Sequence, residues 1–309
     1  MEIKKIKLNF TDFWNGFEKN DNYFYHLLSQ KYDVEISEDP DLLFFSVDYG
    51  RKKERIKYKD HRCKKIFYTG EDVNPNFYLD QDIEMSNFSA HYSVGKCDFA
   101  FSFSRTMDSR NFRLPLWALH IDWFNVGRYG SNPSFLIPFD SIQDNEFIRT
   151  RKTKFCAAVF SNPTQERLKL FNKISNYKRV DGYGSIFGNH SDGELSKYNI
   201  LKDYKFSICP ENRVSNDYFT EKLFHAKVSG TVPIYRHNKK NRFDFNEKCF
   251  INLNDFENED ELLERIKKID SDDDLYYNIF NEPLFSNKDS VEKFNPENVL
   301  RFFEEKILC

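Results

Sequence analysis

The stretch KFSICPENRVSNDYFTEKLFHAKVSGTVPIYRHN, residues 205–238, decides the fold class. It begins with an apolar run of strand length at 205–209, continues through a polar loop, and becomes helical in pattern from Tyr218. Gly230 then ends the helix, and residues 232–235 have the composition of a second strand. A strand, a helix and a strand in this order predict a parallel sheet, in which ligands bind at the carboxyl ends of the strands.

The predicted helix has an apolar face and a polar face. At about 100° per residue, Phe219, Leu223 and Ala226 share a face that suits a core. The other face carries Tyr218, Glu221, Lys222 and His225. At a helix start, an aromatic ring, a carboxylate and an ammonium group can contact the base, the ribose and the phosphates of a nucleotide. A solvated face has the same composition, and the pattern alone favours that interpretation by about two to one.

The same stretch resembles the signature of the α-1,3/4-fucosyltransferases, glycosyltransferase family ten. That signature runs F-E-N, a short polar loop, Y-V-T-E-K, a helix and I-P-I-Y. The matching positions are Glu211, Asn212, Tyr218, Thr220, Glu221, Lys222, Pro233, Ile234 and Tyr235. The resemblance extends over about residues 66–285. It implies an α/β fold of the GT-B type, with two Rossmann-like domains facing across a cleft, and it favours a site on the polar helix face.

A second motif follows an apolar run of strand length at 65–68. Gly70 and Glu71 place a carboxylate on a turn, where adjacent acids serve as turn or cap residues in roughly four cases out of five. The segment resembles the G-E-N-x-x-P-N-F pattern of bacterial family members, with Asp72 in place of Asn. The matching positions are Gly70, Glu71, Pro75, Asn76 and Phe77. The Glu of this pattern is the base proposed to face the acceptor, and the resemblance implies that role for Glu71.

The donor implied by the resemblance carries a negatively charged diphosphate, which protein cations must neutralise. In parts of the family, the turn at 180–185 leads to a basic residue that contacts the diphosphate, but Phe187 occupies that position here. Either Lys222 and helix amides neutralise the diphosphate alone, or another cation contributes. Arg213 is the first candidate, and it is equally compatible with a solvated loop charge. Ser161 and Asn162, between a predicted strand and helix, offer amides for phosphate or a simple helix cap.

The resemblance implies inverting transfer of L-fucose from GDP-fucose to a sugar hydroxyl. The hydroxyl attacks the anomeric carbon in one displacement while Glu71 accepts its proton, and Lys222 stabilises the departing diphosphate. These two residues form the predicted catalytic pair. The predicted donor-binding residues are Gly184, Ser185, Glu211, Asn212, Arg213, Tyr218, Glu221 and Lys222. No D-x-D motif follows a predicted strand, so we expect no obligatory metal or other cofactor.

The expected acceptor is a GlcNAc or glucose hydroxyl of an N-acetyllactosamine- or lactose-type glycan. Such glycans occur in lipopolysaccharide O-antigen and Lewis-type structures, and α-1,3 linkage is the commoner bacterial activity in the family. Two alternatives stay open: a GT-B transferase that uses another sugar nucleotide, and a non-catalytic protein that binds nucleotide or glycan. Glu71, Glu221 and Lys222 together argue against the second, because a pure binder needs no base.

The chain in order predicts two α/β domains, an acceptor-binding domain at 1–140 and a donor-binding domain at 141–309. In the first, strands are expected at 3–10, 42–47, 65–68 and 98–103, with a helix at 22–31. In the second, strands are expected at 154–160, 178–181, 205–209, 232–235 and 249–253, alternating with helices. The stretch 127–140, which contains Gly and Pro, is the predicted linker. In GT-B enzymes the last helix often packs back on the first domain. The predicted last helix of this chain, from Val291, is a candidate for the same arrangement.

Composition sets the remaining expectations. The 309 residues include 46 basic and 49 acidic side chains, a net charge of −3, which gives no general attraction to nucleic acid. Six cysteines without a C-x-x-C pair suggest reduced thiols rather than a zinc site or a disulfide framework. No signal peptide and no run near the roughly 20 apolar residues of a membrane span are visible. We expect a cytoplasmic protein that can contact a membrane peripherally through a lipid-linked acceptor.

Overall fold

The computed structural model describes residues 3–47, 54–72, 97–105, 107–131, 135–143, 151–188, 197–213, 217–287 and 289–309. Pro75, Asn76 and Phe77 of the predicted acceptor motif lie outside these residues. The chain divides into two compact units: unit 1 comprises Met1–Asn132 with Glu292–Cys309, and unit 2 comprises Pro133–Val291. The division falls inside the stretch 127–140, before the boundary predicted at 140, and the residues from Glu292 onward belong to unit 1.

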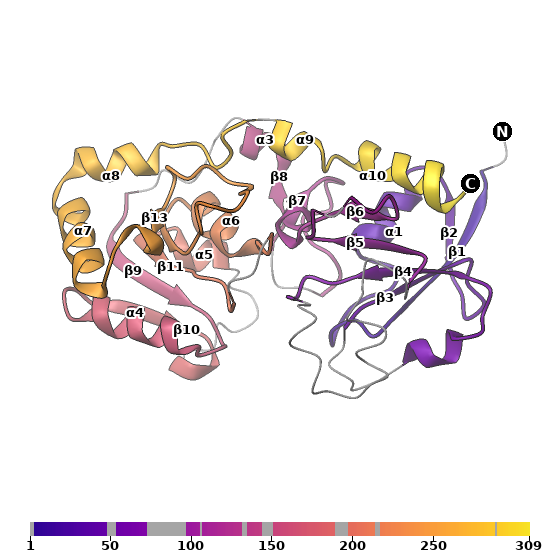
Figure 1. The fold of residues 1–309 in the computed structure, drawn as a ribbon, viewed down its shortest axis with the longest axis horizontal. Helices are drawn as coiled ribbons and strands as arrows, with labels where there is room; N and C mark the ends of the chain where they lie inside the picture. The colour runs from indigo at the N-terminus through magenta and orange to yellow at the C-terminus, as the bar shows by residue number, and fades with distance from the viewer. Residues whose placement is uncertain are drawn as a thin grey trace. The chain divides into compact units, whose positions relative to one another are not determined.

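Unit 1 is built on a parallel sheet with the strand order β2-β1-β3-β4-β5-β6 (Figure 1). Its strands are β1 (Lys5–Thr11), β2 (Asp33–Ile36), β3 (Leu42–Phe45), β4 (Lys64–Tyr68), β5 (Phe99–Ser102) and β6 (Asn111–Arg113), and a short strand β7 (Ile121–Asp122) follows. Every residue of β3 is buried, as expected for a parallel strand covered on both faces. Helix α1 (Tyr23–Ser29) begins after Asn22, whose side chain accepts hydrogen bonds from the amides of Phe24 and Tyr25.

The end of the chain completes the core of unit 1. Helix α10 (Pro296–Phe302) continues into a π-helical turn at Phe303–Ile307. The ring of Phe303 stacks on Phe101 at 5.1 Å between centroids and lies 6.2 Å from the ring of Phe44. Phe303 and Ile307 are fully buried, so this segment is part of the hydrophobic core.

Unit 2 contains a second parallel sheet, with the strand order β10-β9-β11-β12-β13. Its strands are β9 (Lys154–Val159), β10 (Val180–Tyr183), β11 (Tyr204–Ile208), β12 (Val232–Tyr235) and β13 (Ile251–Asn252), with a short β8 (Ile137–Pro138) before them. The helices are α3 (Phe139–Gln143), α4 (Gln165–Ser175), α5 (Lys197–Leu201), α6 (Glu221–Val228), α7 (Glu259–Ser271) and α8 (Asp273–Phe280), and α9 (Asp289–Glu292) lies at the division between the units. Strands 205–209 and 232–235 of the prediction correspond to β11 and β12.

Helices cover both faces of the sheet of unit 2. Alternate residues of β9 point to opposite faces, so Cys156 and Ala158 pack with α4, α7 and α8, whereas Ala157 packs with α5 and α6. This doubly wound arrangement places every strand-to-helix loop at the carboxyl edge of the sheet. The functional residues predicted from the loops of this half therefore share one edge.

Side-chain caps start helices α4 and α8. Neither Ser161 nor Asn162 caps α4; the cap is Thr164, whose hydroxyl accepts a hydrogen bond from the amide of Arg167 at 3.4 Å. The cap lies after Pro163 because a proline disfavours the helical conformation of the residue before it. Asp272 caps α8 by accepting from the amide of Leu275 at 3.1 Å, so the acidic run at 272–274 starts a helix.

Candidate functional site

Loops after two parallel strands of unit 2 carry the predicted donor-binding residues. Gly184 and Ser185 follow β10, and the segment from Glu211 to Arg213 follows β11. The strands run parallel, with β9 between them, so both loops lie at the carboxyl edge of the sheet. Helix α6 comes after β11 and starts at the same edge, which brings Glu221 and Lys222 to it.

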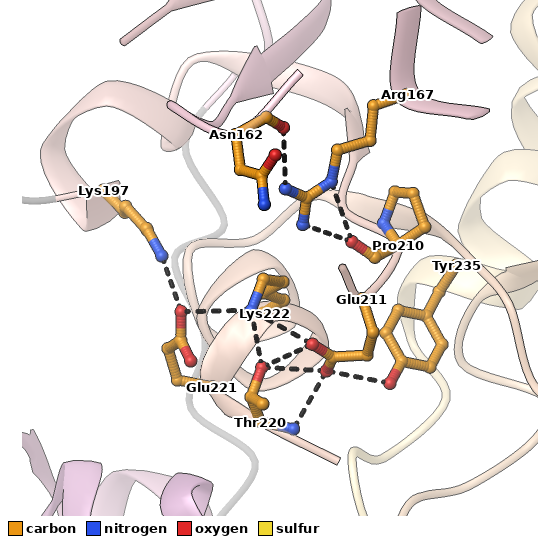
Figure 2. A network of polar contacts seen from close by, with 9 residues as sticks. All are labelled: Asn162, Arg167, Lys197, Pro210, Glu211, Thr220, Glu221, Lys222 and Tyr235. Atoms are coloured by element: carbon orange, nitrogen blue, oxygen red, sulfur yellow. Dashed lines mark hydrogen bonds and ion pairs between the residues drawn. The ribbon is translucent and has the colours of Figure 1, made fainter. Parts of the chain in front are cut away.

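Glu211 lies at the centre of a buried network (Figure 2). Its carboxylate accepts hydrogen bonds from the amide of Thr220 at 2.9 Å, from the hydroxyl of Thr220 at 2.7 and 2.8 Å, and from the hydroxyl of Tyr235 at 3.0 Å. The Nζ atom of Lys222 lies 3.0 Å from the carboxylate and donates to the Thr220 hydroxyl at 2.9 Å. Glu211 thus joins the loop after β11, the start of α6 and the end of β12. Through these partners Glu211 holds the three elements together, which we call its bracing role. A direct contact between Glu211 and the donor stays a prediction.

Helix α6 begins later than the sequence predicted, at Glu221 rather than Tyr218. Asp217 has a left-handed backbone, with φ of 64°, so the chain turns before Tyr218, which is 4% exposed. The carboxylate of Glu211 caps the amide of Thr220 from outside the local sequence. The predicted polar face is therefore wrong in two positions, because Tyr218 precedes the helix and His225 is buried.

Glu221 and Lys222 are the first two residues of α6, and both engage in ion pairs. Burial alone would lower the pKa of Lys222, but the carboxylates of Glu211 and Glu221 outweigh it and raise the pKa. Glu221 accepts a hydrogen bond from Nζ of Lys197 at 2.8 Å and lies 3.9 Å from Nζ of Lys222. The result is a chain of alternating charge at the helix start: Lys197, Glu221, Lys222 and Glu211 (Figure 2).

A buried arginine that the sequence did not single out completes this group. The side chain of Arg167, on α4, donates to the carbonyl oxygen of Pro210 from Nε at 3.2 Å and from Nη2 at 2.6 Å. Its Nη1 atom donates to the carbonyl oxygen of Asn162 at 3.1 Å. A sequence signal existed, because Arg167 shares the i, i+3, i+7 stripe of Leu170 and Ile174, where a core side chain is expected.

The remaining predicted donor residues lie in the loops themselves. The Oδ1 atom of Asn212 is buried, and among the described residues no donor lies within hydrogen-bond distance of it. Arg213 is exposed and lines a small cavity with Tyr218, Tyr235 and other residues. A buried amide oxygen without a protein donor is costly, which is consistent with a site that a ligand completes.

The turn after β10 is shaped by close backbone contacts. A Cβ atom on Gly184, whose φ is 121°, would lie 2.3 Å from the carbonyl oxygen of Phe160, so a side chain cannot fit. Phe187 packs against Phe160 and Phe171, with ring centroids 5.4 and 4.9 Å away, and covers Gly182. The position that is basic in parts of the family is thus occupied in this chain by a partly buried ring that packs against the core.

Glu71 lies at the carboxyl edge of the sheet of unit 1. It follows β4 on an exposed turn, and its amide donates to the hydroxyl of Thr69 at 3.1 Å. This bond fixes the turn locally. A Cβ atom on Gly70 would lie 2.9 Å from Cδ2 of Leu116, which favours glycine beside the carboxylate. The geometry suits a reactive group on a hydrogen-bonded turn, and the role of Glu71 as base stays a prediction.

Two family models match the chain. The model described as "Alpha-(1,3)-fucosyltransferase FucT N-terminal domain" matches residues 8–120, and "Glycosyltransferase family 10 (fucosyltransferase) C-term" matches residues 149–293. The chain belongs to glycosyltransferase family 10. The matched ranges include Glu71 in the first model and the whole Arg167–Glu211–Lys222 group in the second.

Relatives of this family 10 chain come from a bacterium, a virus and animals. The α-(1,3)-fucosyltransferase FucT of Helicobacter pylori is 26% identical, over 97% of this chain and 65% of the relative. A putative fucosyltransferase, R654, of Acanthamoeba polyphaga mimivirus is 36% identical over 50% of this chain and 28% of the relative. The mouse 4-galactosyl-N-acetylglucosaminide 3-alpha-L-fucosyltransferase 9 is 30% identical over 46% of this chain and 41% of the relative. The chain thus spans 65% or less of the length of each of these relatives.

Solved structures confirm the predicted fold class. A crystal structure of an α1,3-fucosyltransferase matches with a TM-score of 0.71 at 25% identity, covering 99% of this chain and 91% of that one. A structure of an α1,3-fucosyltransferase with GDP-fucose matches with a TM-score of 0.68 at 25% identity, covering 98% and 90%. The family 10 chain therefore has the α/β fold of the GT-B class, with a parallel sheet in each unit.

In the part of the chain that the structure describes, no group of three His, Cys, Asp or Glu side chains is arranged to hold a metal ion. Over the same residues, no helix combines the length and the apolar character that crossing a bilayer requires.

The hydroxyl of Tyr235 offers a direct test of the network around Glu211. Tyr235→Phe removes one hydrogen bond to a buried carboxylate, a contact typically worth about 1.5–3 kcal/mol. We expect the free energy of unfolding of unit 2 to fall by about that amount in urea denaturation. Tyr276→Phe is the matched control, because its hydroxyl donates to the carbonyl of Lys205 at the long distance of 3.5 Å. Equal losses in the two variants would contradict the bracing role of Glu211.

Proposed function

We propose that this chain is an inverting fucosyltransferase that moves L-fucose from GDP-fucose to a hydroxyl of a GlcNAc- or glucose-containing glycan. The observation that carries the proposal is the charged start of α6, where Lys222 is held by Glu211 beside Glu221 at the carboxyl edge of unit 2. Family membership supports the reaction class, and the similar structure described with GDP-fucose supports the donor.

Each residue of the proposed donor site has a chemical task. The ammonium of Lys222 stabilises the negative charge that develops on the departing diphosphate. Glu221 accepts hydrogen bonds from the ribose hydroxyls and is held in place by Lys197. Asn212 and Tyr218 position the nucleotide or fucose, with Gly184 and Ser185 lining the neighbouring turn. Because the reaction is a single displacement, no enzyme nucleophile is required.

Glu71 acts on the acceptor. Its carboxylate accepts the proton of the attacking hydroxyl, a contribution typically worth about 10²–10⁴-fold in rate. The names of the bacterial and mouse relatives support α-1,3 linkage, and the mouse name includes an N-acetylglucosaminide acceptor. We propose a lactose- or N-acetyllactosamine-type acceptor, as in lipopolysaccharide O-antigen or Lewis-type glycans. We also propose a metal-independent reaction in the cytoplasm, with peripheral membrane contact when the acceptor is lipid-linked.

The test is a transfer assay with GDP-fucose and N-acetyllactosamine in the presence of EDTA. The proposal predicts a fucosylated trisaccharide whose linkage is α-1,3 by nuclear magnetic resonance. If no product forms but GDP-fucose binds in calorimetry, the donor assignment holds and the acceptor assignment is wrong. If GDP-fucose neither reacts nor binds, the fucosyltransferase proposal fails.

A further inference from the structure

A cavity lies at the amino edge of the sheet of unit 2, where its strands begin and opposite the loops of the proposed donor site. Its volume is about 560 Å³, within the range of small-molecule binding sites. Arg151 and Lys152, just before β9, line one part of it with Lys205 of β11, and α8 lines another. Strand β11 has five residues, at about 3.3 Å each, so about 17 Å of strand separates this cavity from the donor loops. Both can therefore be occupied at once.

Three cations line the cavity. Nζ of Lys152 donates to the carbonyl oxygen of Lys202 at 2.6 Å. Nζ of Lys205 donates to the carbonyl oxygen of Asp270 at 2.9 Å and lies 3.0 Å from its carboxylate. Arg151 is exposed, and no carboxylate among the described residues lies within 4.0 Å of its guanidinium. The cavity thus combines two ammonium groups held by backbone contacts with a guanidinium open to an anion.

Acidic side chains do not neutralise these cations. Among the described residues that line the cavity, Asp273 is the single carboxylate. Asp270, behind the wall, is shared by Lys205 and Lys178, so one carboxylate faces two lysines. The excess of positive charge favours a negatively charged ligand.

Lys152 shows the electrostatic consequence of its position. Burial lowers its pKa to about 8, and the nearby charge of Asp203 opposes this only in part. The ammonium is therefore less stable here than on the surface, and a bound anion would offset that cost. Its amine is also unprotonated more often at neutral pH than that of an ordinary lysine, which makes it a better nucleophile.

The wall from α8 is aromatic. Tyr277 is 51% exposed, and its ring lies 5.2 Å from the ring of Tyr276 and 6.0 Å from that of Phe280. Nζ of Lys205 lies 4.8 Å from the ring centroid of Tyr276. Nζ of Lys152 lies 5.8 Å from the ring centroid of Phe280. An exposed ring beside buried aromatic neighbours and cations offers a surface on which a flat ring can stack.

We propose that this cavity is a second ligand site, which binds a phosphate ester that carries a flat heterocyclic ring, the chemical class of a mononucleotide. The guanidinium of Arg151 and the ammonium of Lys152 contact the phosphate, and the ring stacks on Tyr277. A planar guanidinium suits the oxygens of a phosphate. The inference does not depend on the identity of the donor, because the donor loops lie at the other edge of the sheet.

Pyridoxal 5′-phosphate is a direct probe, because it joins a phosphate ester, an aromatic ring and an aldehyde. The unprotonated amine of Lys152 attacks the aldehyde carbon and forms an imine with loss of water, and added borohydride reduces the imine to a stable secondary amine. By peptide mapping, we expect labelling of Lys152 to be at least about tenfold faster than that of Lys154, an exposed lysine two positions later. Adenosine 5′-monophosphate should slow the labelling of Lys152, and adenosine should slow it much less.

Calorimetry with adenosine 5′-monophosphate and inorganic phosphate tests the two walls separately. Tyr277→Ala should weaken the affinity for the nucleotide about 5-fold to 100-fold and leave that for phosphate within about twofold. Arg151→Gln should weaken both affinities about tenfold. Arg179→Gln is the matched control, because it removes an exposed guanidinium of unit 2 that does not line the cavity, and both affinities should stay unchanged.

Several outcomes would overturn the inference. Labelling of Lys152 that is no faster than that of Lys154, or that the nucleotide does not slow, would show that the cavity is not a site. Equal losses in Arg151→Gln and Arg179→Gln would show general electrostatic attraction. An unchanged nucleotide affinity in Tyr277→Ala would contradict the proposed ligand class. None of these measurements uses GDP-fucose, so failure of this inference and failure of the proposed function are distinguishable.

Discussion

Lys222→Met should lower kcat/KM for fucosyl transfer by about 10²–10³-fold, the usual effect of removing one stabilising donor from a developing negative charge. The ammonium is the charged group that the start of α6 presents at the edge of unit 2, and Glu211 and Glu221 keep it protonated. GDP binding should weaken in the same variant, whereas guanosine binding should change little. Initial rates with GDP-fucose and calorimetry with both ligands check these expectations.

A structural effect accompanies the catalytic one and needs its own control. Lys222→Met leaves the buried carboxylate of Glu211 without its cation, and breaking a buried ion pair typically costs about 3–5 kcal/mol. In the double variant Glu211→Gln/Lys222→Met the uncompensated charge is gone, so the urea midpoint should recover in part. Transfer should stay low in the double variant. Recovery of transfer together with stability would show that Lys222 has only a structural role.

Glu71→Gln should lower kcat for transfer by about 10²–10⁴-fold, because an amide cannot accept the proton of the attacking hydroxyl. The side chain lies on an exposed turn of unit 1, so the melting temperature and GDP affinity should match those of the parent. The pH profile gives a second readout: the decline of kcat at acidic pH in the parent should be absent in the variant.

Asp72→Asn is the matched control for Glu71→Gln. It makes the same change of acid to amide at the next position, where the side chain is buried rather than exposed. We expect its kcat to stay within about threefold of the parent, because Asp72 has no proposed part in proton transfer. A larger loss of kcat in Asp72→Asn than in Glu71→Gln would show that Asp72, and not Glu71, is the base.

In unit 1, the sequence predicted the four central strands and missed both edge strands. Runs such as LLFF in β3 and the apolar centre of β11 are buried on both faces, so their composition alone identifies them. β2, with the sequence DVEI, and β6, with the sequence NFR, lie at the two ends of the sheet order of unit 1. Edge strands are short and partly exposed, so they carry little periodic signal, and neither was predicted.

The site residues also differ in how well the sequence predicted them, according to whether their contacts are close or distant in sequence. The resemblance located Glu221 and Lys222 at a helix start, because their spacing is local. The predicted first residue of the helix was wrong, because the backbone amide of Thr220 is capped by the carboxylate of Glu211, nine positions earlier. The contact between Arg167 and Pro210 joins residues 43 positions apart, and no periodicity or motif encodes such a pair. Buried polar contacts of long sequence separation are therefore the part of this site that required the structure.

The return of the final segment to unit 1 has a consequence for how the protein is made. Unit 2 is one continuous piece of chain, whereas the core of unit 1 includes Phe303 and Ile307, which are synthesised after unit 2. On the ribosome, unit 2 can therefore finish folding while unit 1 still lacks the ring that stacks on Phe101. The earlier residues of unit 1 keep aromatic surface exposed until then, so we expect chaperone dependence during translation to concentrate on unit 1 rather than on unit 2.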